Sequence, residues 1–153
     1  MKEFDYELNY KTIAFSLEEN RKLYRIGRGE QGVLLVRPYT NDICTHWKFR
    51  TPEIAVKSSN RIFGMYLDYR DQKDFIRMDM CRKVLEMGFT RARRYANHNS
   101  GKKYDSEGNI RPQEPDHATS KYAESAKIFK KVRDIVAKSD IYVTMRKEWR
   151  ASE

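Results

Sequence analysis

The stretch TPEIAVKSSNRIFGMYLDYRDQKDFIRMDMCRKVLEMG, residues 51–88, decides the fold. Thr51 can cap a helix, Pro52 suits the first helical position, and Glu53 favours the positive end of the helix dipole. Small or apolar side chains then recur at helical spacing. These are Ile54, Ser58, Ile62, Met65 and Tyr69. The pattern predicts a helix that begins at Thr51.

A second helix is predicted over residues 75–87, with Asp74 as its cap and Gly88 as its end. Its apolar stripe consists of Ile76, Met80, Val84 and Met87. Residues 122–138 carry another apolar face at helical spacing, and a last helix is predicted to begin at Ser139-Asp140. Helix is therefore expected to be the largest structural class.

Two short apolar runs lie before Thr51. Val33-Leu34-Leu35-Val36 is rich in β-branched residues, and residues 44–49 form the second run. The two runs can pair as a hairpin across residues 39–43. We therefore expect an α+β, mainly helical fold, in which residues 1–153 form a single compact domain with a small β-hairpin near the N-terminal third.

Length and composition exclude several classes of protein. A chain of 153 residues fits one domain and can bury a core without metals or disulfides. No apolar run approaches the roughly 20 residues that cross a bilayer, and MKEFDYELNY has no apolar signal-peptide core. The cysteines, Cys44 and Cys81, are too few for a disulfide framework. We expect a cytoplasmic protein with no membrane contact and no cofactor.

The positive charge is uneven along the chain. The formal net charge is +9, and most of the excess lies after residue 76. The segment FTRARRYANHNSGKKY, residues 89–104, contains no acid. If Thr90 begins a short helix, its free N–H groups suit a phosphate, and Arg91, Arg94 and His98 share one side of that helix. Lys102 and Lys103 follow on a loop. The alternative interpretation is a solvated charged face.

That loop is predicted to span residues 99–120. It is polar and is interrupted by Gly101, Gly108, Pro112 and Pro115. Loops of this length are usually functional or disordered. We expect the loop to be mobile and able to close over a bound ligand.

The glycine motif Gly27-Arg28-Gly29-Glu30-Gln31-Gly32 is a second candidate site. A dinucleotide fingerprint needs a strand before it and a helix after it, and the expected order here is the reverse. A protein-kinase interpretation also fails, because no H-R-D or D-F-G motif follows. Arg28 and Gly29 remain candidates for holding an anion. The alternative is a tight turn.

Other motifs carry less weight. Trp47, beside His46, is a candidate stacking platform for a base, although a buried tryptophan is the commoner case. Cys44-x-His46 has no second pair with zinc spacing, so we expect no metal site. No catalytic residue can be assigned from the sequence.

Four stretches together resemble a known family. They are YRIGRGEQGVLLVRPY (24–39), HWKFRTPEIA (46–55), MDMCRKVLEMGFTRARRYANH (78–98) and GKKYD (101–105). They resemble a family of small proteins described only as a conserved domain of unknown function, met in bacteria, in algae and in large tailed phages. The resemblance implies a cytoplasmic, single-domain protein and supplies no activity.

Three functions remain open. The chain is expected to bind a phosphate-rich ligand, nucleic acid or nucleotide, because excess positive charge attracts phosphates without further geometry. An enzyme acting on such a ligand is the first alternative, and an interaction module for an acidic protein partner is the second. Convergence of Arg28, Glu30, His46 and Arg94 in one pocket would favour a small-ligand site or an enzyme.

Overall fold

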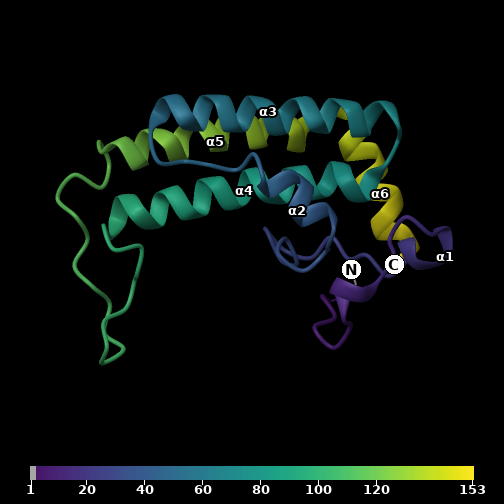
Figure 1. The fold of residues 1–153 in the computed structure, drawn as a ribbon, viewed down its shortest axis with the longest axis horizontal. Coiled ribbons are helices and arrows are strands. Elements are labelled where there is room, and N and C mark those ends of the chain that lie inside the picture. Colours follow the sequence, from purple (N-terminus) through teal and green to yellow (C-terminus); the bar gives the residue numbers. More distant parts are fainter. Residues whose placement is uncertain (1–2) are drawn as a thin grey trace.

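The computed structural model describes residues 3–153 (Figure 1). Its long helices are α3 (Pro52–Asp71), α4 (Phe75–Asn97) and α5 (Lys121–Lys138), which lie side by side, each antiparallel to the one before it. At one end of this bundle α6 (Asp140–Ser152) turns away from α5, and at the other end the segment between α4 and α5 projects outward. The helices share one apolar core with the N-terminal segment.

The predicted helix starts at Thr51 and Asp74 are confirmed by their capping bonds, and a third capping bond, at Ser120, marks a helix start for which the sequence predicted no cap. Thr51 Oγ1 accepts a hydrogen bond from the N–H of Ile54, 3.2 Å away, with Pro52 at the first helical position. Asp74 accepts one from the N–H of Arg77, and Ser120 accepts one from the N–H of Ala123. Each side chain satisfies a donor that has no partner inside its own helix.

The predicted end of the second helix at Gly88 is wrong. Helix α4 continues through Gly88 to Asn97 and ends at His98. A Cβ at position 88 would lie 2.3 Å from Cδ1 of Phe129 on α5, so the glycine allows the two helices to approach closely. The glycine at position 88 is explained by its contact with Phe129, 41 positions away in the sequence. A rule for helix ends, which uses only neighbouring residues, cannot detect such a contact.

The expected α+β fold with a β-hairpin is also wrong. Helix accounts for 58% of the structure, and among residues 3–153 there is no sheet. Residues 31–35 form successive turns, and residues 39–44 form the short helix α2 (Tyr39–Cys44). The side chains of Val33 and Val36 are both buried in the core, so burial, and not pairing as a strand, accounts for the apolar run. Thr40 Oγ1 donates a hydrogen bond to the carbonyl of Val33, 2.6 Å away, which stabilises this non-strand arrangement.

The rest of the N-terminal segment contains a 3-10 turn, Tyr10–Thr12, and the single-turn helix α1 (Glu18–Arg21). Its buried side chains include Tyr10, Phe15 and Tyr24. Helix α2 packs beside α4, and Trp149 of α6 donates a hydrogen bond to the carbonyl of Tyr24 over 3.1 Å. This segment therefore covers the junction between α4 and α6.

The loop predicted for residues 99–120 lies outside the helices, at the far end of the bundle (Figure 1). An isolated bridge joins Tyr104 to Ile110 near its tip. The loop is tied to the end of α4 by a hydrogen bond from the N–H of Glu114 to the carbonyl of Asn97, 2.8 Å long. Its mobility stays a prediction.

In the described part of the chain, no helix combines the length and the apolar character needed to span a membrane.

Candidate functional site

Asp79 is the centre of a buried polar cluster on α4. Its side chain is fully buried. Oδ1 accepts hydrogen bonds from Tyr142 Oη, 2.6 Å away, and from Arg82 Nε, 2.9 Å away. Oδ2 accepts a hydrogen bond from Tyr24 Oη and lies 3.8 Å from Lys83 Nζ. Because Tyr24 belongs to the N-terminal segment and Tyr142 to α6, Asp79 links three parts of the chain.

The charges in this cluster oppose the effect of burial. Burial alone would raise the pKa of Asp79, but Arg82, Lys83 and the tyrosine hydrogen bonds lower it to about 2. Burial would lower the pKa of Arg82, but Asp79 raises it above its usual value. Burial lowers the pKa of Lys83 to about 7, against the opposing effect of Asp79. Asp79 and Arg82 are therefore both charged at neutral pH.

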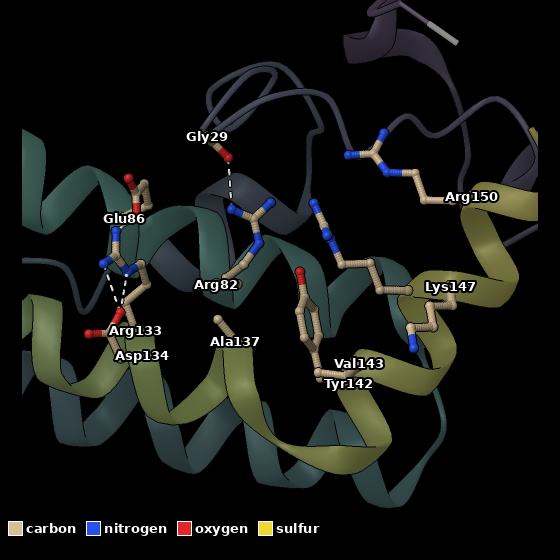
Figure 2. A pocket seen from close by; sticks show the side chains of 11 residues that line it. Gly29, Arg82, Glu86, Arg133, Asp134, Ala137, Tyr142, Val143, Lys147 and Arg150 are labelled. Carbon is tan, nitrogen blue, oxygen red and sulfur yellow. Dashed lines mark hydrogen bonds and ion pairs between the residues drawn. The ribbon is translucent and has the colours of Figure 1, made fainter. Parts of the chain in front are cut away.

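Arg82 also faces a cavity of about 510 Å³ between α4, α5, α6 and the glycine motif of residues 27–32, which we call the glycine turn. Arg82 Nη1 donates a hydrogen bond to the carbonyl of Gly29 over 2.8 Å, so its guanidinium is fixed at two points. Figure 2 shows Arg82 and Tyr142 bordering this space, with Arg150 on α6 beyond them. We call the cavity the α4–α6 cleft. Its charged lining residues are Arg82, Glu86, Arg133, Asp134, Arg146, Lys147 and Arg150.

The two acids of the α4–α6 cleft are both held by one arginine. Arg133 Nη2 donates to Asp134 Oδ1 over 2.7 Å, and Arg133 Nη1 donates to Glu86 Oε2 (Figure 2). These groups are partly buried, with side-chain exposures of 20%, 31% and 17% for Arg133, Asp134 and Glu86. Lys130 Nζ also donates to Asp134 Oδ2 over 3.3 Å, so two cations of α5 balance the two acids, and the acids do not neutralise the cations contributed by α6.

Helix α6 contributes three cations to the cleft, Arg146, Lys147 and Arg150, and the first two carry positive charge that is unpaired among the described residues. Within residues 3–153, neither Arg146 nor Lys147 has an ion-pair partner. Arg150 donates a hydrogen bond to the carbonyl of Gly27 over 2.9 Å, and its Nη1 lies 3.7 Å from Glu153 Oε2. The cleft thus combines a fixed guanidinium, Arg82, with uncompensated cations on the facing helix.

Three of the sequence-predicted residues gather elsewhere, at the end of α4. Arg94, His98 and Lys103 line a hollow of about 290 Å³. We call it the distal hollow; its other lining residues are Phe89, Thr90, Arg93 and Asn97. The remaining two predicted residues of that segment, Arg91 and Lys102, do not line it.

Thr90 does not begin a helix, so the predicted phosphate site at a helix start is wrong. Thr90 lies inside α4, and its Oγ1 donates its hydrogen to Glu30 Oε2, 2.9 Å away, with the carbonyl of Met87 as a second acceptor within reach at 3.2 Å. The physical reason is the uninterrupted helix through Gly88. The basic side chains of this segment therefore project from the last turns of α4.

The remaining predicted residues occupy separate places. Arg28 is exposed, and its N–H donates to Gln31 Oε1 over 2.7 Å. Gly29 lines the α4–α6 cleft and presents its carbonyl oxygen to Arg82. Trp47 is half-buried, with its ring centroid 5.2 Å from that of Phe49.

Arg28, Glu30, His46 and Arg94 do not converge in one pocket. His46 lines a hollow with Lys57 and Ser58, whereas Arg94 lines the distal hollow. Burial raises the pKa of Glu30, against the opposing effects of the hydrogen bond from Thr90 and of the positive charge of Arg94. The arrangement that would favour an enzyme built on these residues is absent from the described structure.

Apart from Gly29, sequence reasoning missed the residues of the α4–α6 cleft. One signal was available: Asp79, Arg82 and Lys83 stand at i, i+3 and i+4 between the apolar positions Ile76, Met80 and Val84 of the predicted stripe. Charges at core positions are usually paired with each other. The basic residues Arg146, Lys147 and Arg150 carried no such signal, because charges on a last helix are ordinary.

Metal ligands are not clustered in the described part of the chain. No group of three or more His, Cys, Asp or Glu side chains there is placed to hold a metal ion. Cys44 and Cys81 are free thiols.

Comparison with known proteins identifies the family. A family model described as "Domain of unknown function (DUF4385)" matches residues 5–152. The chain belongs to this family. The DUF4385 match spans the glycine turn, α4 and α6, so both the α4–α6 cleft and the distal hollow lie inside the domain. No curated protein and no solved structure matches the chain.

Proposed function

We propose that this DUF4385 protein binds a small phosphate-bearing ligand, of nucleotide size, in the α4–α6 cleft. One observation carries the proposal: Arg82, Arg146, Lys147 and Arg150 line the same cavity, while both acids there are bonded to Arg133. A volume of about 510 Å³ suits a small molecule, since ligand pockets usually measure roughly 300–1,000 Å³.

Arg82 is suited to the first contact with a phosphate. It is 8% exposed, and two hydrogen bonds hold its guanidinium before any ligand arrives. A fixed guanidinium loses little freedom on binding, and Nη2 is the nitrogen of Arg82 that these two hydrogen bonds leave to donate to a phosphate. Because Asp79 keeps Arg82 charged and Tyr142 positions Asp79, the buried cluster supports the wall of the cleft.

Binding is favoured over the enzymatic alternative by the state of the acids. Glu86 and Asp134 are the carboxylates of the cleft, and both accept hydrogen bonds from Arg133. A carboxylate paired with an arginine is a weak proton acceptor. Hydrolysis of a nucleotide during the binding assay below would favour the enzyme instead.

The proposal is tested with inorganic pyrophosphate and a panel of nucleoside mono-, di- and triphosphates. Isothermal titration calorimetry and thermal unfolding should both show binding at low salt, since a ligand that binds only the folded state raises its stability. Arg146→Glu combined with Lys147→Glu should abolish the signal, because the variant reverses the two uncompensated charges.

Lys131→Glu, on α5, is the matched control. Lys131 is exposed and does not line the cleft, so this single charge reversal should weaken binding by only about twofold through screened, long-range attraction. Circular dichroism should show all variants folded. If wild-type protein binds none of the phosphate compounds at low salt, the proposed function is wrong.

We also propose that the protein works in the cytoplasm of bacteria, algae or phage-infected cells. The two free thiols support this, because a reducing compartment keeps cysteines unpaired. Fractionation of a host cell tests it, and recovery from an extracytoplasmic fraction would contradict it.

A further inference from the structure

The α4–α6 cleft and the distal hollow open along the same face of α4. From α4, the cleft is lined by Arg82 and Glu86, and the hollow by Phe89, Thr90, Arg93, Arg94 and Asn97. Thr90 and Arg94 lie to one side, and the other five positions are spaced by four, three, four and four residues, which places those five in one stripe of a helix. Arg82 and Asn97 are separated by about 22 Å along the axis at 1.5 Å per residue.

Arg133 of α5 joins the two cavities. It lines the α4–α6 cleft, and its guanidinium carbon lies 5.5 Å from the ring centroid of Phe89, which lines the distal hollow. One side chain from α5 therefore borders one cavity and covers a wall residue of the other. We call the two cavities, together with the contact of Arg133 and Phe89 between them, the α4 groove.

The distal end of the α4 groove carries charge of the same sign as the cleft. Arg94 and Lys103 are both exposed, and within residues 3–153 neither has an ion-pair partner. His98 is 8% exposed, and its Nδ1 has no hydrogen-bond partner among the described residues. A buried imidazole nitrogen without a partner is costly unless something pairs with it, so this position suits a ligand atom.

An exposed aromatic side chain stands next to this end. Tyr104 is 53% exposed, and Lys103 Nζ lies 5.6 Å from its ring centroid. An exposed ring beside a cation is the arrangement on which single-stranded nucleic acids stack a base while a phosphate contacts the charge. An acidic protein would use the lysine and gain less from the ring.

We propose that the α4 groove binds single-stranded nucleic acid, with one phosphate in the α4–α6 cleft and the following nucleotides extending past Arg133 to Arg94, Lys103 and Tyr104. This inference rests on the proposed phosphate site and extends it from a small ligand to a strand. A single strand leaves its bases free to stack on Tyr104, whereas the bases of a duplex are already stacked and paired.

The test measures binding of labelled oligo-dT of 2, 4, 8 and 12 nucleotides by fluorescence anisotropy, with pyrophosphate as competitor. Affinity should rise by at least tenfold from dT2 to dT8 and then level off, because the groove has a finite length. A duplex of 12 base pairs should bind less tightly than dT12.

Two variants assign the distal end. Arg94→Glu with Lys103→Glu should weaken dT12 by at least tenfold while leaving pyrophosphate binding within about twofold. Tyr104→Ala should weaken dT12 by about tenfold, the scale of one stacked base, with no effect on pyrophosphate. All three side chains are exposed, so the variants should fold, and Lys131→Glu serves again as the charge control.

The outcomes separate the two proposals. If pyrophosphate binds and dT12 binds no more tightly than dT2, the strand inference is wrong and the phosphate site stands. If poly-glutamate of equal charge competes as well as dT12, the groove is a protein-binding surface and the strand inference is overturned. If neither pyrophosphate nor any oligonucleotide binds, the proposed function fails as well.

Discussion

Arg82 and Asp79 form an ion pair one turn apart on α4, with 2.9 Å between Arg82 Nε and Asp79 Oδ1. The same guanidinium reaches the carbonyl of Gly29 and borders the α4–α6 cleft. A buried carboxylate thus fixes a cation at the edge of a cavity. The stability of the core and the geometry of the cleft depend on the same group.

Asp79→Asn should destabilise the protein strongly. The amide leaves the Arg82 guanidinium buried without a compensating charge, and breaking a buried pair in this way typically costs about 3–5 kcal/mol. Urea denaturation measures the change in the free energy of unfolding. Asp68→Asn, at an exposed position on α3, should change it by less than about 0.5 kcal/mol. Equal effects of the two substitutions would contradict the importance of the cluster.

Stability should rise with pH above neutrality because of Lys83. Burial lowers its pKa to about 7 in the folded protein, whereas an unfolded lysine titrates near 10.4. Between these values the unfolded chain holds a proton that the folded chain has released, so the free energy of unfolding increases with pH, by at most about 1.4 kcal/mol per pH unit.

Urea titrations between pH 7 and 8 measure this slope. Lys83→Met should remove it, since methionine fills similar space without a titrating group. The range ends at pH 8 because burial raises the pKa values of Cys81 and Cys44, so that above about pH 8 the unfolded chain loses thiol protons that the folded chain keeps, and stability falls. An unchanged slope in Lys83→Met would show that another group causes it.

The two glycines inside the long helices should respond to alanine in opposite directions. At Gly88 a new Cβ would lie 2.3 Å from the Phe129 ring, and overpacking of this kind typically costs about 1–3 kcal/mol. At Gly64, on α3, nothing lies within 4 Å, so alanine should stabilise the helix by about 0.5–1 kcal/mol. Thermal unfolding of both variants checks the signs, and a stabilised Gly88→Ala would mean that α4 and α5 are less closely packed.

The loop at residues 99–120 should be the first site of proteolysis. The apolar side chains that could anchor the loop, Tyr104 and Ile110, are 53% and 63% exposed. They bury too little surface to offset the entropy cost of ordering the loop. Brief trypsin digestion should cut first at Lys102, Lys103 or Arg111, as mass spectrometry of the fragments would show. A first cut inside residues 54–87 would contradict this prediction.

The helical part of the fold could be predicted because its signals are local. Thr51 and Asp74 cap the helices that follow them, as their sequence context indicates. The hairpin prediction failed because a short apolar run does not distinguish a strand from a buried turn. Val33 and Val36 belong to a buried segment of turns and bends. Gly88 was misassigned because its partner, Phe129, is distant in the sequence.

The candidate site divides in the same way. Arg94, His98 and Lys103 lie within ten positions of one another, and the sequence placed them together. Arg82 and Arg146 are 64 positions apart, and only the packing of α6 against the end of α4 brings them to one cavity. Tertiary contacts of that kind leave no periodic signal in a single sequence.

The last prediction separates two neighbouring arginines that the sequence treated as equal. Arg94 lines the distal hollow and Arg91 does not. If a strand follows the α4 groove, Arg94→Gln should reduce the slope of log affinity for dT12 against log salt by about 0.7, the share of one phosphate contact on a single strand. Arg91→Gln should leave that slope unchanged and weaken binding only slightly, because its charge acts on the phosphates from outside the groove. Anisotropy titrations at several salt concentrations between low and physiological ionic strength measure both slopes. Equal losses for the two variants would show that the strand binds an open charged face of α4, where neither arginine has a defined contact.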